Sequence, residues 1–367
     1  MEGAMTINIG VDLHKTQFTV YARNGEGMFG KYGTTAEGYG CFIKQLNAWR
    51  EEGHQVRLAV ESTGNTRFFK RQFSGEGYPV TVINPMKFKV INESVKKTDR
   101  HDAATIAEFL EKDMLPEAWL CGEKSEELRR LLKVRQSLVR TMVTIKNQIH
   151  GLLMSLGMED EAASLQSKRG RQEILDTLSR AHSGLGAQTL FETIDLLEGQ
   201  VKKIEKELAI LVEKDETVGL LRSIPGCGLI TASTIRAYTD DIRRFRTYKQ
   251  YSAYAGLAPW VQCSNETTHY GRITKRGPEP LRTAYVQMVL GMVRLKKKTL
   301  SYRLMQRYRG LKMDKGSGKA IIATARKLSK VVWFMLMTGK EFDPSLMIDK
   351  TLNEKAEVMR SSTVQTA

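Results

Sequence analysis

Residues 6–12 read TINIGVD, and residues 16–23 read TQFTVYAR. Apolar and polar side chains alternate along both stretches, and a short turn separates them. A period of two is typical of strands with one buried face, so the two stretches predict a β-hairpin. A third strand near residues 28–34 extends the predicted meander.

Helices and strands then alternate along the chain. Residues 36–51 show helical spacing, with Phe42, Leu46 and Trp49 on one face. Further strands are predicted at residues 56–61 (VRLAVE) and 79–84 (PVTVIN), and further helices at residues 65–73 and 102–112. A meander followed by alternating helices and strands predicts a mixed α/β sheet, in an N-terminal domain that spans residues 5–118.

The middle of the chain, residues 119–216, predicts coiled-coil helices. Its apolar side chains recur at gaps of three and four in two runs, and Arg135 interrupts one core position of the first. The first run contains Leu128, Leu131, Leu138, Met142, Ile145, Ile149, Leu152 and Leu156, and the second covers residues 194–211. The two helices could pair within one subunit or form an arm between subunits, and the pattern favours neither.

The region from residue 217 to 345 is predicted to be mainly helical. Helices are expected at residues 280–298 and 319–338, and no strand is expected there. The remaining residues, 346–367, are polar and are expected to be disordered.

The net charge of the chain is +16, and one region carries the excess. Residues 221–340 hold 24 Lys and Arg against 5 Asp and Glu, a balance of +19, so the rest of the chain is slightly acidic. A localised excess of this size attracts a polyanion, and it favours a nucleic-acid partner over a merely soluble basic surface.

Several classes of protein are disfavoured by composition. No stretch approaches 18 consecutive apolar residues, so no transmembrane helix and no membrane partner are expected. The first residues lack the basic and apolar segments of a signal peptide. The four cysteines are scattered without CxxC spacing, which argues against a zinc site or a disulfide framework and fits a reducing cytoplasm.

Four carboxylates in the N-terminal half are candidate metal ligands. Asp12 and Glu61 each end a predicted strand, and strand ends can meet at one edge of a sheet. Asp99 and Asp102, in KTDRHDA, are three residues apart at the start of a predicted helix and share one face. Such carboxylates can hold two Mg²⁺ ions for phosphoryl transfer, although Asp102 alone could simply cap its helix.

Two motifs of the basic region suggest contact with nucleic acid. IPGCG, residues 224–228, lies between two helical patterns and resembles a helix-hairpin-helix, whose backbone N–H groups, at Gly226 and Gly228 among others, can point at a DNA phosphate. The second motif is a polar loop that places Ser264 ahead of three cations, Arg272, Lys275 and Arg276.

The hydroxyl of Ser264 can attack phosphorus if it is activated and cations stabilise the charge. On chemistry alone, a loop serine that makes a turn hydrogen bond is the simpler interpretation. A third candidate motif, GSGKA at residues 316–320, does not have the spacing of a nucleotide-binding P-loop, and Ala320 cannot hold Mg²⁺.

Taken together, these motifs resemble the Asp-Glu-Asp-Asp insertion-sequence transposases, a family that includes the Piv-type DNA invertases. The matching pieces are IGVDLHK, AVESTG, VINP, KTDRHDA, SIPGCGLITA, YAGLAP and ITKRG. They occur in the family's order over roughly residues 7–342, and although each is short, the ordered set is specific.

The resemblance implies a RuvC-like (RNase H-like) catalytic domain with Asp12, Glu61, Asp99 and Asp102 as its Mg²⁺-binding tetrad. It also implies a catalytic serine after YAGLAP, here Ser264. Many relatives have Gly after the serine, whereas this chain has Asn265 and a loop one residue shorter, so Thr267 and Thr268 stay open as alternatives.

The resemblance also implies partners. Family members studied act on donor and target DNA, use a bridge RNA that pairs with both, and assemble as tetramers with active sites built from two subunits. By this resemblance the chain is a bacterial or archaeal cytoplasmic enzyme, a homo-dimer or homo-tetramer, that associates with the nucleoid when active.

Two other functions fit parts of the sequence. A structure-specific junction nuclease would need the RuvC-like core but not the long C-terminal region or Ser264. A non-catalytic nucleic-acid-binding scaffold would need neither the serine nor four placed carboxylates. Only the recombinase hypothesis predicts protein joined covalently to DNA through serine.

Overall fold

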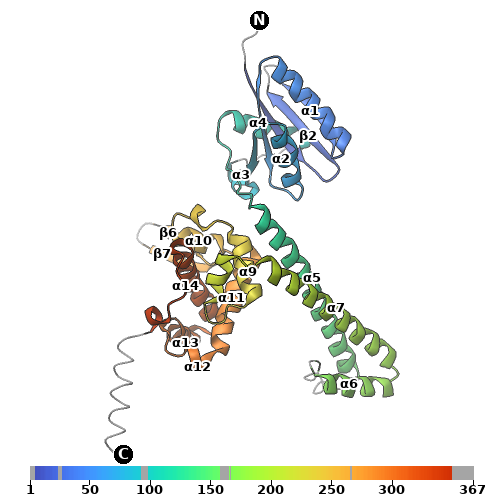
Figure 1. The fold of residues 1–367 in the computed structure, drawn as a ribbon, viewed down its shortest axis with the longest axis vertical. Coiled ribbons are helices and arrows are strands. Elements are labelled where there is room, and N and C mark those ends of the chain that lie inside the picture. The colour runs from blue at the N-terminus through green and yellow to red at the C-terminus, as the bar shows by residue number, and fades with distance from the viewer. Residues whose placement is uncertain are drawn as a thin grey trace, which may run out of the picture. The chain divides into compact units, whose positions relative to one another are not determined.

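The computed structural model describes residues 5–23, 27–91, 98–157, 165, 167–264 and 267–348. The chain divides into two compact units, Met1–Leu120 and Cys121–Ala367. The first unit contains a five-stranded sheet with helices on it, and the second is mainly helical (Figure 1).

The sheet of the first unit mixes antiparallel and parallel strands. Its strands are β1 (Thr6–Leu13), β2 (Gln17–Arg23), β3 (Met28–Gly33), β4 (Gln55–Glu61) and β5 (Val80–Ile83). Their order in the sheet is β3-β2-β1-β4-β5, with β1, β2 and β3 antiparallel and β4 and β5 parallel to β1. The mixed sheet that the sequence predicts is therefore present, and it is compatible with an RNase H-like domain.

Helices cover both faces of this sheet. The helices are α1 (Ala36–Glu51), α2 (Thr66–Gly75), α3 (Pro85–Ile91) and α4 (Asp99–Glu111). Odd-numbered residues of β1, such as Ile9, share a buried core with Phe42 of α1 and Phe69 of α2. On the other face Ile106 of α4 packs against Ala59 of β4. The period of two along β1 thus separates a core face from the face that α4 covers.

The start of α4 differs from the prediction. The helix begins at Asp99 rather than at residue 102. The cap is Thr98, whose hydroxyl accepts a hydrogen bond from the backbone N–H of His101 at 3.2 Å. Because Thr98 caps the helix, Asp102 does not, and its carboxylate is available for another role.

The second unit begins with a pair of long helices, α5 (Glu123–Ser155) and α7 (Gly184–Leu211), which lie side by side (Figure 1). They run antiparallel, since Leu128 shares a core with Leu208 and Ile149 shares one with Ile194. The heptad runs therefore pair within one chain, and their use between subunits stays a prediction. Arg135, which interrupts the heptads, forms an ion pair with Glu205 of α7 at 2.6 Å.

A shorter helix, α6 (Lys168–Arg180), lies between α5 and α7, outside both heptad runs. Its Ile174 and Leu178 join the core between α5 and α7. Across the described residues, no helix is both long enough and apolar enough to cross a membrane.

The rest of the second unit is a helical body around α14. Its helices are α8 (Glu216–Arg222), α9 (Leu229–Thr239), α10 (Tyr248–Tyr254), α11 (Glu279–Arg294), α12 (Lys296–Thr299), α13 (Arg303–Lys315) and α14 (Ser317–Thr338), with short 3-10 turns at Ile242–Arg244 and Pro344–Met347. Buried residues of α14, such as Leu328, belong to the largest core of the chain. The single helix expected at residues 280–298 ends instead at Arg294, and α13 was not predicted.

Two further expectations for this unit are wrong. A hairpin of two strands, β6 (Pro259–Ser264) and β7 (Thr267–Ile273), occurs where no strand was expected. The hairpin projects from the core, with Trp260 and Val261 exposed, so a buried face did not mark it in the sequence. Within the tail expected to be disordered, residues 346–348 are placed, and Ile348 pairs with Tyr302; the tail from residue 349 lies outside the described residues.

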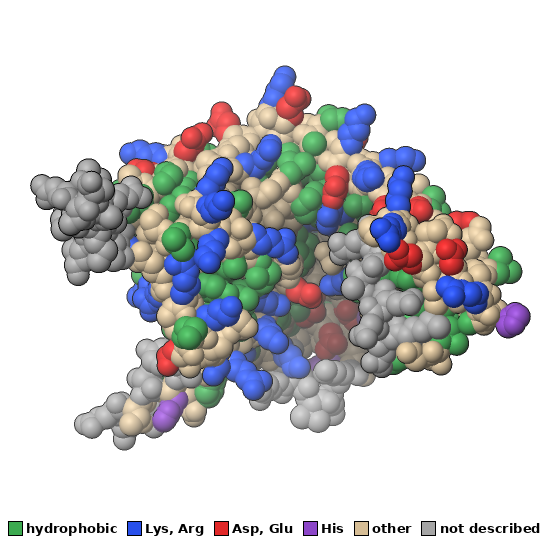
Figure 2. Space-filling model, turned by 90° about the horizontal axis from the view of Figure 1, so that it is seen from below, with side chains coloured by type: hydrophobic (Ala, Val, Ile, Leu, Met, Phe, Trp, Pro, Cys, Tyr) green, Lys and Arg blue, Asp and Glu red, His purple; other side chains and the backbone are tan. Residues whose placement is uncertain are grey.

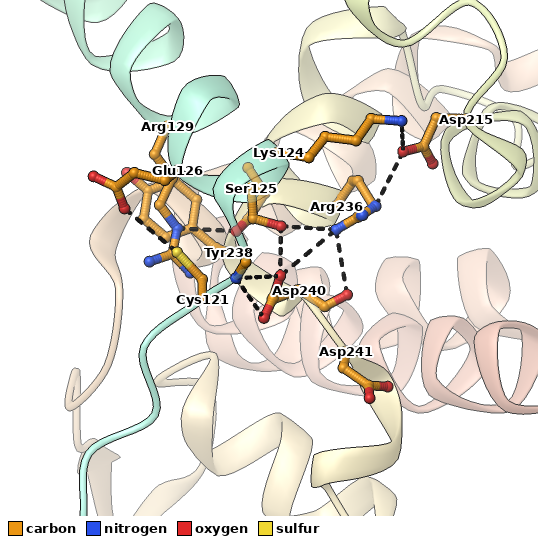
Figure 3. Close-up of polar contacts among 12 residues, drawn as sticks. Cys121, Lys124, Ser125, Glu126, Arg129, Asp215, Arg236, Tyr238, Asp240 and Asp241 are labelled. Atoms are coloured by element: carbon orange, nitrogen blue, oxygen red, sulfur yellow. Dashed lines mark hydrogen bonds and ion pairs between the residues drawn. The ribbon is translucent and has the colours of Figure 1, made fainter. Parts of the chain in front are cut away.

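Polar contacts fasten the start of α5 to the end of α9 (Figure 3). The carboxylate of Asp240 accepts hydrogen bonds from the backbone N–H of Gly122 at 3.2 Å and from the hydroxyl of Ser125 at 2.6 Å. Arg236, one turn earlier on α9, donates to the same hydroxyl at 2.8 Å and to Asp215 at 3.2 Å. Because these charges are mostly buried, pairing them offsets the cost of removing them from water.

Candidate functional site

Asp12 and Glu61 lie side by side at one edge of the sheet. Strands β1 and β4 are parallel, and Val11 pairs with Val60, so the next residue along each strand is a carboxylate. Neighbouring strands are about 4.8 Å apart, and equivalent positions point to the same face. The two side chains therefore start from adjacent backbone positions.

A close contact between β1 and α4 brings the other two candidate carboxylates to the same place. A Cβ atom on Gly10 would lie 2.0 Å from the carbonyl oxygen of Ala103, so glycine is required for α4 to approach this closely. Gly10 and Asp12 share one face of β1, and the first turn of α4 contains Asp99 and Asp102. All four predicted tetrad residues are thus gathered in the first unit.

Replacing Gly10 by Ala tests this contact. We expect the variant to lose about 1–3 kcal/mol of unfolding free energy, because the added methyl group overpacks a backbone contact. Gly40→Ala is the matched control: its Cβ has no atom within 4 Å in α1, and we expect a gain of about 0.5–1 kcal/mol. Chemical denaturation of both variants measures the difference, and a Gly10→Ala protein as stable as the wild type would contradict the contact.

His14, which the sequence analysis did not single out, belongs to the same cluster. Its Nε2 atom lies 3.1 Å from Oδ2 of Asp12 and 3.5 Å from Oδ1 of Asp99. One ligand atom from each of these three residues lies within 4.8 Å of the others, a spacing that one metal ion could bridge. The signal in the sequence was a histidine two residues after a strand-end aspartate, in IGVDLHK.

Side chains near the start of α2 hold the turns that carry these residues. The side-chain amide of Asn65 donates to the backbone carbonyl of His14 at 2.9 Å. The hydroxyl of Thr66 donates to the carbonyl of Glu61 at 2.7 Å, and it also accepts from the backbone N–H of Thr63 at 2.7 Å. The ends of β1 and β4 are therefore tied together through one loop, which fixes where Asp12 and Glu61 point.

The carboxylates of the cluster repel one another. Burial raises the pKa of Asp12, and the charges of Asp99 and Asp102 raise it further, although His14 acts in the opposite direction. Burial likewise raises the pKa of Glu61, with added contributions from Asp12 and Asp102. Among the described residues, no lysine or arginine forms an ion pair with any of the four. Such a set favours binding of a cation, which would relieve the repulsion.

The donor atoms suit a hard divalent cation. Carboxylate oxygens are the preferred ligands of Mg²⁺, and they fit Mn²⁺ equally, whereas the imidazole of His14 suits Mn²⁺ better than Mg²⁺. Asp12 is mostly buried and fixed in a strand, while the side chains of His14 and Asp99 are each 47% exposed. The site is therefore fixed by the sheet on one side and open to solvent on the other.

In the second unit, Ser264 lies at the closed end of the β6–β7 hairpin. Its backbone pairs with that of Thr267, and Cys263 pairs with Thr268. Residue Asn265 lies outside the described residues. The hairpin therefore places the predicted nucleophile and both alternatives within one short segment and does not choose among them.

The basic residues after the hairpin lie on a tightly constrained turn. Lys275 has a positive φ of 53°, and the guanidinium of Arg282 donates to its carbonyl at 3.1 Å. Gly277 has a φ of 114°, and a Cβ there would lie 1.9 Å from the carbonyl oxygen of Tyr254. The segments YAGLAP and ITKRG thus pack together, and they hold exposed Lys275 and Arg276 in one conformation next to the hairpin.

Comparison with known proteins identifies the family. Residues 9–158 match the IS110-type DEDD transposase model, and residues 218–303 match the model described as "Transposase IS116/IS110/IS902 family". Together these two matches span well over half of the chain. The chain belongs to the IS110/IS116/IS902 family of transposases. The first match contains the carboxylate cluster and the second contains the β6–β7 hairpin.

Curated relatives agree with this membership. The transposase for insertion sequence element IS1111A of Coxiella burnetii is 28% identical, over 76% of this chain and 77% of its own length. The transposase for element IS1328 of Yersinia enterocolitica is 27% identical, over 91% and 98%. A pilin gene-inverting protein of Moraxella bovis is 23% identical, over 82% and 87%. As a member of this family the chain is an insertion-sequence transposase, an enzyme that acts on DNA.

The IPGCG segment of this transposase lies between α8 and α9. Gly226 has a φ of 87°, and a Cβ there would lie 2.6 Å from the backbone nitrogen of Met292 and 2.7 Å from the carbonyl carbon of Gly291, both on α11. Its glycine is thus required for internal packing. Gly228 is exposed and precedes the first turn of α9. Contact of either residue with phosphate stays a prediction.

Proposed function

We propose that this transposase cuts and rejoins DNA with Ser264 as the nucleophile. Four carboxylates bind two divalent cations, which are Mg²⁺ in the cell: Asp12, Glu61, Asp99 and Asp102. The observation that carries the proposal is the convergence of four carboxylates, from the ends of two strands and the first turn of one helix, at one edge of the five-stranded mixed sheet. Among the described residues, no lysine or arginine forms an ion pair with any of the four, and His14 contacts Asp12 and Asp99.

Each residue has a defined task in this proposal. Bound Mg²⁺ would activate the attacking oxygen and stabilise the charge on the leaving oxygen. Asp12 and Glu61 would supply fixed ligands from the sheet, while Asp99 and Asp102 would complete the site from α4. His14 would orient Asp12 and Asp99 or take a ligand position itself, and Asn65 would hold the turn on which His14 lies.

In the covalent step, one phosphate ester replaces another. The Oγ atom of Ser264 forms a bond to phosphorus, the bond from phosphorus to one deoxyribose oxygen breaks, and the serine proton passes to solvent while the freed sugar oxygen gains one. Attack by a free sugar hydroxyl on the phosphoserine reverses the step, rejoins a strand and restores Ser264. Lys275 and Arg276 would stabilise the phosphate charge near the hairpin.

The proposal includes a bridge RNA and assembly into a homo-dimer or homo-tetramer, and both rest on the family resemblance. The basic second unit gives a nucleic acid a surface to bind, since residues 221–340 carry the whole net positive charge. A discrete RNA that co-purifies with the protein would support the RNA partner, and the mass of the complex in solution would give the number of subunits.

Metal binding can be tested apart from catalysis. We expect Mg²⁺ to raise the melting temperature of the wild-type protein, because a ligand at about 100 times its Kd stabilises the folded state by about 2.7 kcal/mol. The double variant Asp12→Asn, Glu61→Gln should melt higher than the wild type in EDTA, since it lacks two repelling charges, and should not respond to Mg²⁺. Sodium chloride at equal ionic strength is the control for both proteins. An equal response of both proteins to Mg²⁺ would contradict the proposed ligands.

A further inference from the structure

A second basic surface lies in the C-terminal unit, apart from the β6–β7 hairpin. Residues 294–319 contain ten Lys and Arg and one acidic residue, Asp314. They form the end of α11, all of α12 and α13, and the start of α14. We call this surface the α12–α13 face. Its exposed cations include Arg294, Lys296, Lys297, Lys298, Arg307, Lys312 and Lys319.

Within the described part of the chain, Lys296, Arg307 and Lys312 of this face form no ion pair. Lys315 approaches Asp314 at 3.9 Å. Elsewhere in the unit basic residues are paired, as Arg135 is with Glu205. Like charges on one surface repel one another and destabilise the free protein. A polyanion bound to the surface would remove this unfavourable repulsion.

Two glycines leave backbone uncovered on the same face. Gly310 lies three residues after Arg307 on the exposed side of α13, and Gly318 lies in the first turn of α14. A Cβ on either would meet no atom within 4 Å, so internal packing does not explain the glycine. Glycine inside a helix lowers its stability, and close approach of a ligand to the backbone is one reason to keep it.

The face and the hairpin lie at opposite ends of the helical body around α14. Figure 1 shows β6 and β7 at one end of this body and α12 and α13 at the other. Figure 2 is seen from below the view of Figure 1, and its left part shows many Lys and Arg side chains with few acidic ones among them. A nucleic acid bound at this face would therefore not lie at Ser264 of the same unit.

The side chains of the face favour duplex over single-stranded nucleic acid. Proteins that hold single strands stack the bases on exposed aromatic rings. The two aromatic residues between 294 and 319, Tyr302 and Tyr308, are both buried, and the exposed large apolar residues are Leu295, Leu300 and Met313. Cations without aromatic partners suit the phosphate backbone of a duplex.

We propose that the α12–α13 face binds the phosphate backbone of duplex DNA. This bound DNA is a different segment from the one that Ser264 in the β6–β7 hairpin of the same subunit would cut. The choice of DNA rests on the proposed function, because a transposase must hold DNA that flanks its cutting site. Such binding would be independent of base sequence and would help to keep two DNA segments on one assembly.

The first test removes charge. Full-length protein is titrated in EDTA with a 30-base-pair DNA duplex, in the wild type and in the variant K296Q/K298Q/R307Q/K312Q. Each lost phosphate contact lowers the slope of log K against log salt by about 0.9, so four lost contacts should reduce affinity on the order of 100-fold or more near physiological salt. The matched control, K133Q/K202Q/K203Q/K206Q, makes the same charge change on exposed positions of α5 and α7 and should retain most of the affinity.

The second test uses the glycines. G310A should raise the melting temperature, because alanine favours the helix, and should weaken binding of the duplex because a methyl group blocks the backbone. G199A, at an equally open position of α7, should raise the melting temperature with no effect on binding. The proposal would be overturned if K296Q/K298Q/R307Q/K312Q bound the DNA duplex as tightly as its control variant. It would also be overturned if this variant lost affinity for an RNA duplex of the same sequence but kept its affinity for DNA.

These results are separable from the catalytic proposal, because binding in EDTA requires no metal chemistry. Strand cleavage is then measured with saturating protein and Mg²⁺. Loss of cleavage in Asp12→Asn together with normal duplex binding by the charge variant would leave the proposed function intact and reject the α12–α13 face.

Discussion

Replacing Asp12 by Asn should reduce the rate of strand cleavage at least about 1000-fold in Mg²⁺. Metal ions that stabilise charge in the transition state lower the activation free energy by several kcal/mol, and each 1.36 kcal/mol changes the rate tenfold. Asp12 is held at the end of β1 beside Glu61, and the first turn of α4 lies against the same strand. The substitution preserves the shape of the side chain and removes one negative ligand. Binding of DNA should persist, since the basic surfaces lie in the other unit.

Asp113→Asn is the matched control for this change. Asp113 follows α4 in the same unit, is exposed and pairs with Arg57 at 2.6 Å, and its positive φ of 52° is one that asparagine tolerates. Cleavage is measured under single-turnover conditions on a labelled DNA substrate. Normal cleavage by Asp12→Asn, or an equal loss in both variants, would contradict the assignment of Asp12 as a metal ligand.

The second large effect is expected at the hairpin. Ser264→Ala should remove the covalent protein–DNA product and reduce recombination on the order of 1000-fold or more, the scale of removing a nucleophile. Folding should be unaffected, because residue 264 ends a hairpin that projects from the core. Ser301→Ala, an exposed serine of the same unit, is the control.

The covalent product can be trapped on a nicked DNA substrate and mapped by mass spectrometry. An adduct on Ser264 is the expected result. An adduct on Thr267 or Thr268 would move the nucleophile within the hairpin, because Ser264 pairs with Thr267 and Cys263 with Thr268. Full recombination by Ser264→Ala with no adduct at any residue would instead favour a metal nuclease that uses water.

Much of the N-terminal unit could be predicted from its sequence because its elements bury one face. The alternation of TINIGVD and VRLAVE predicted strands β1 and β4. Asp12 is the last residue but one of β1, and Glu61 is the last residue of β4. The close approach of α4 to Gly10 could not be predicted from this alternation, because it depends on contacts between residues about 90 positions apart. The place of His14 followed only from that approach, since it brings Asp99 to the same side of the strand.

In the C-terminal unit the sequence pattern was less informative for a physical reason. The β6–β7 hairpin is largely exposed, so selection for a buried face does not shape its sequence. The break between α11 and α12 at Leu295 lies in a run of good helix formers, where tertiary packing overrides local propensity. Gly226 was predicted to open the backbone to DNA. Its φ of 87° and its close contact with Gly291 require glycine independently of DNA, and its contact with phosphate stays a prediction.

The most direct measurement is to locate metal ions in crystals of the protein soaked in Mn²⁺, by anomalous scattering. We expect two peaks among Asp12, Glu61, Asp99 and Asp102, with His14 next to the ion that Asp12 and Asp99 share. The Asp12→Asn protein should lose at least one of them. The absence of any peak at this edge of the sheet, with Mn²⁺ bound elsewhere in the chain, would contradict the proposed catalytic centre.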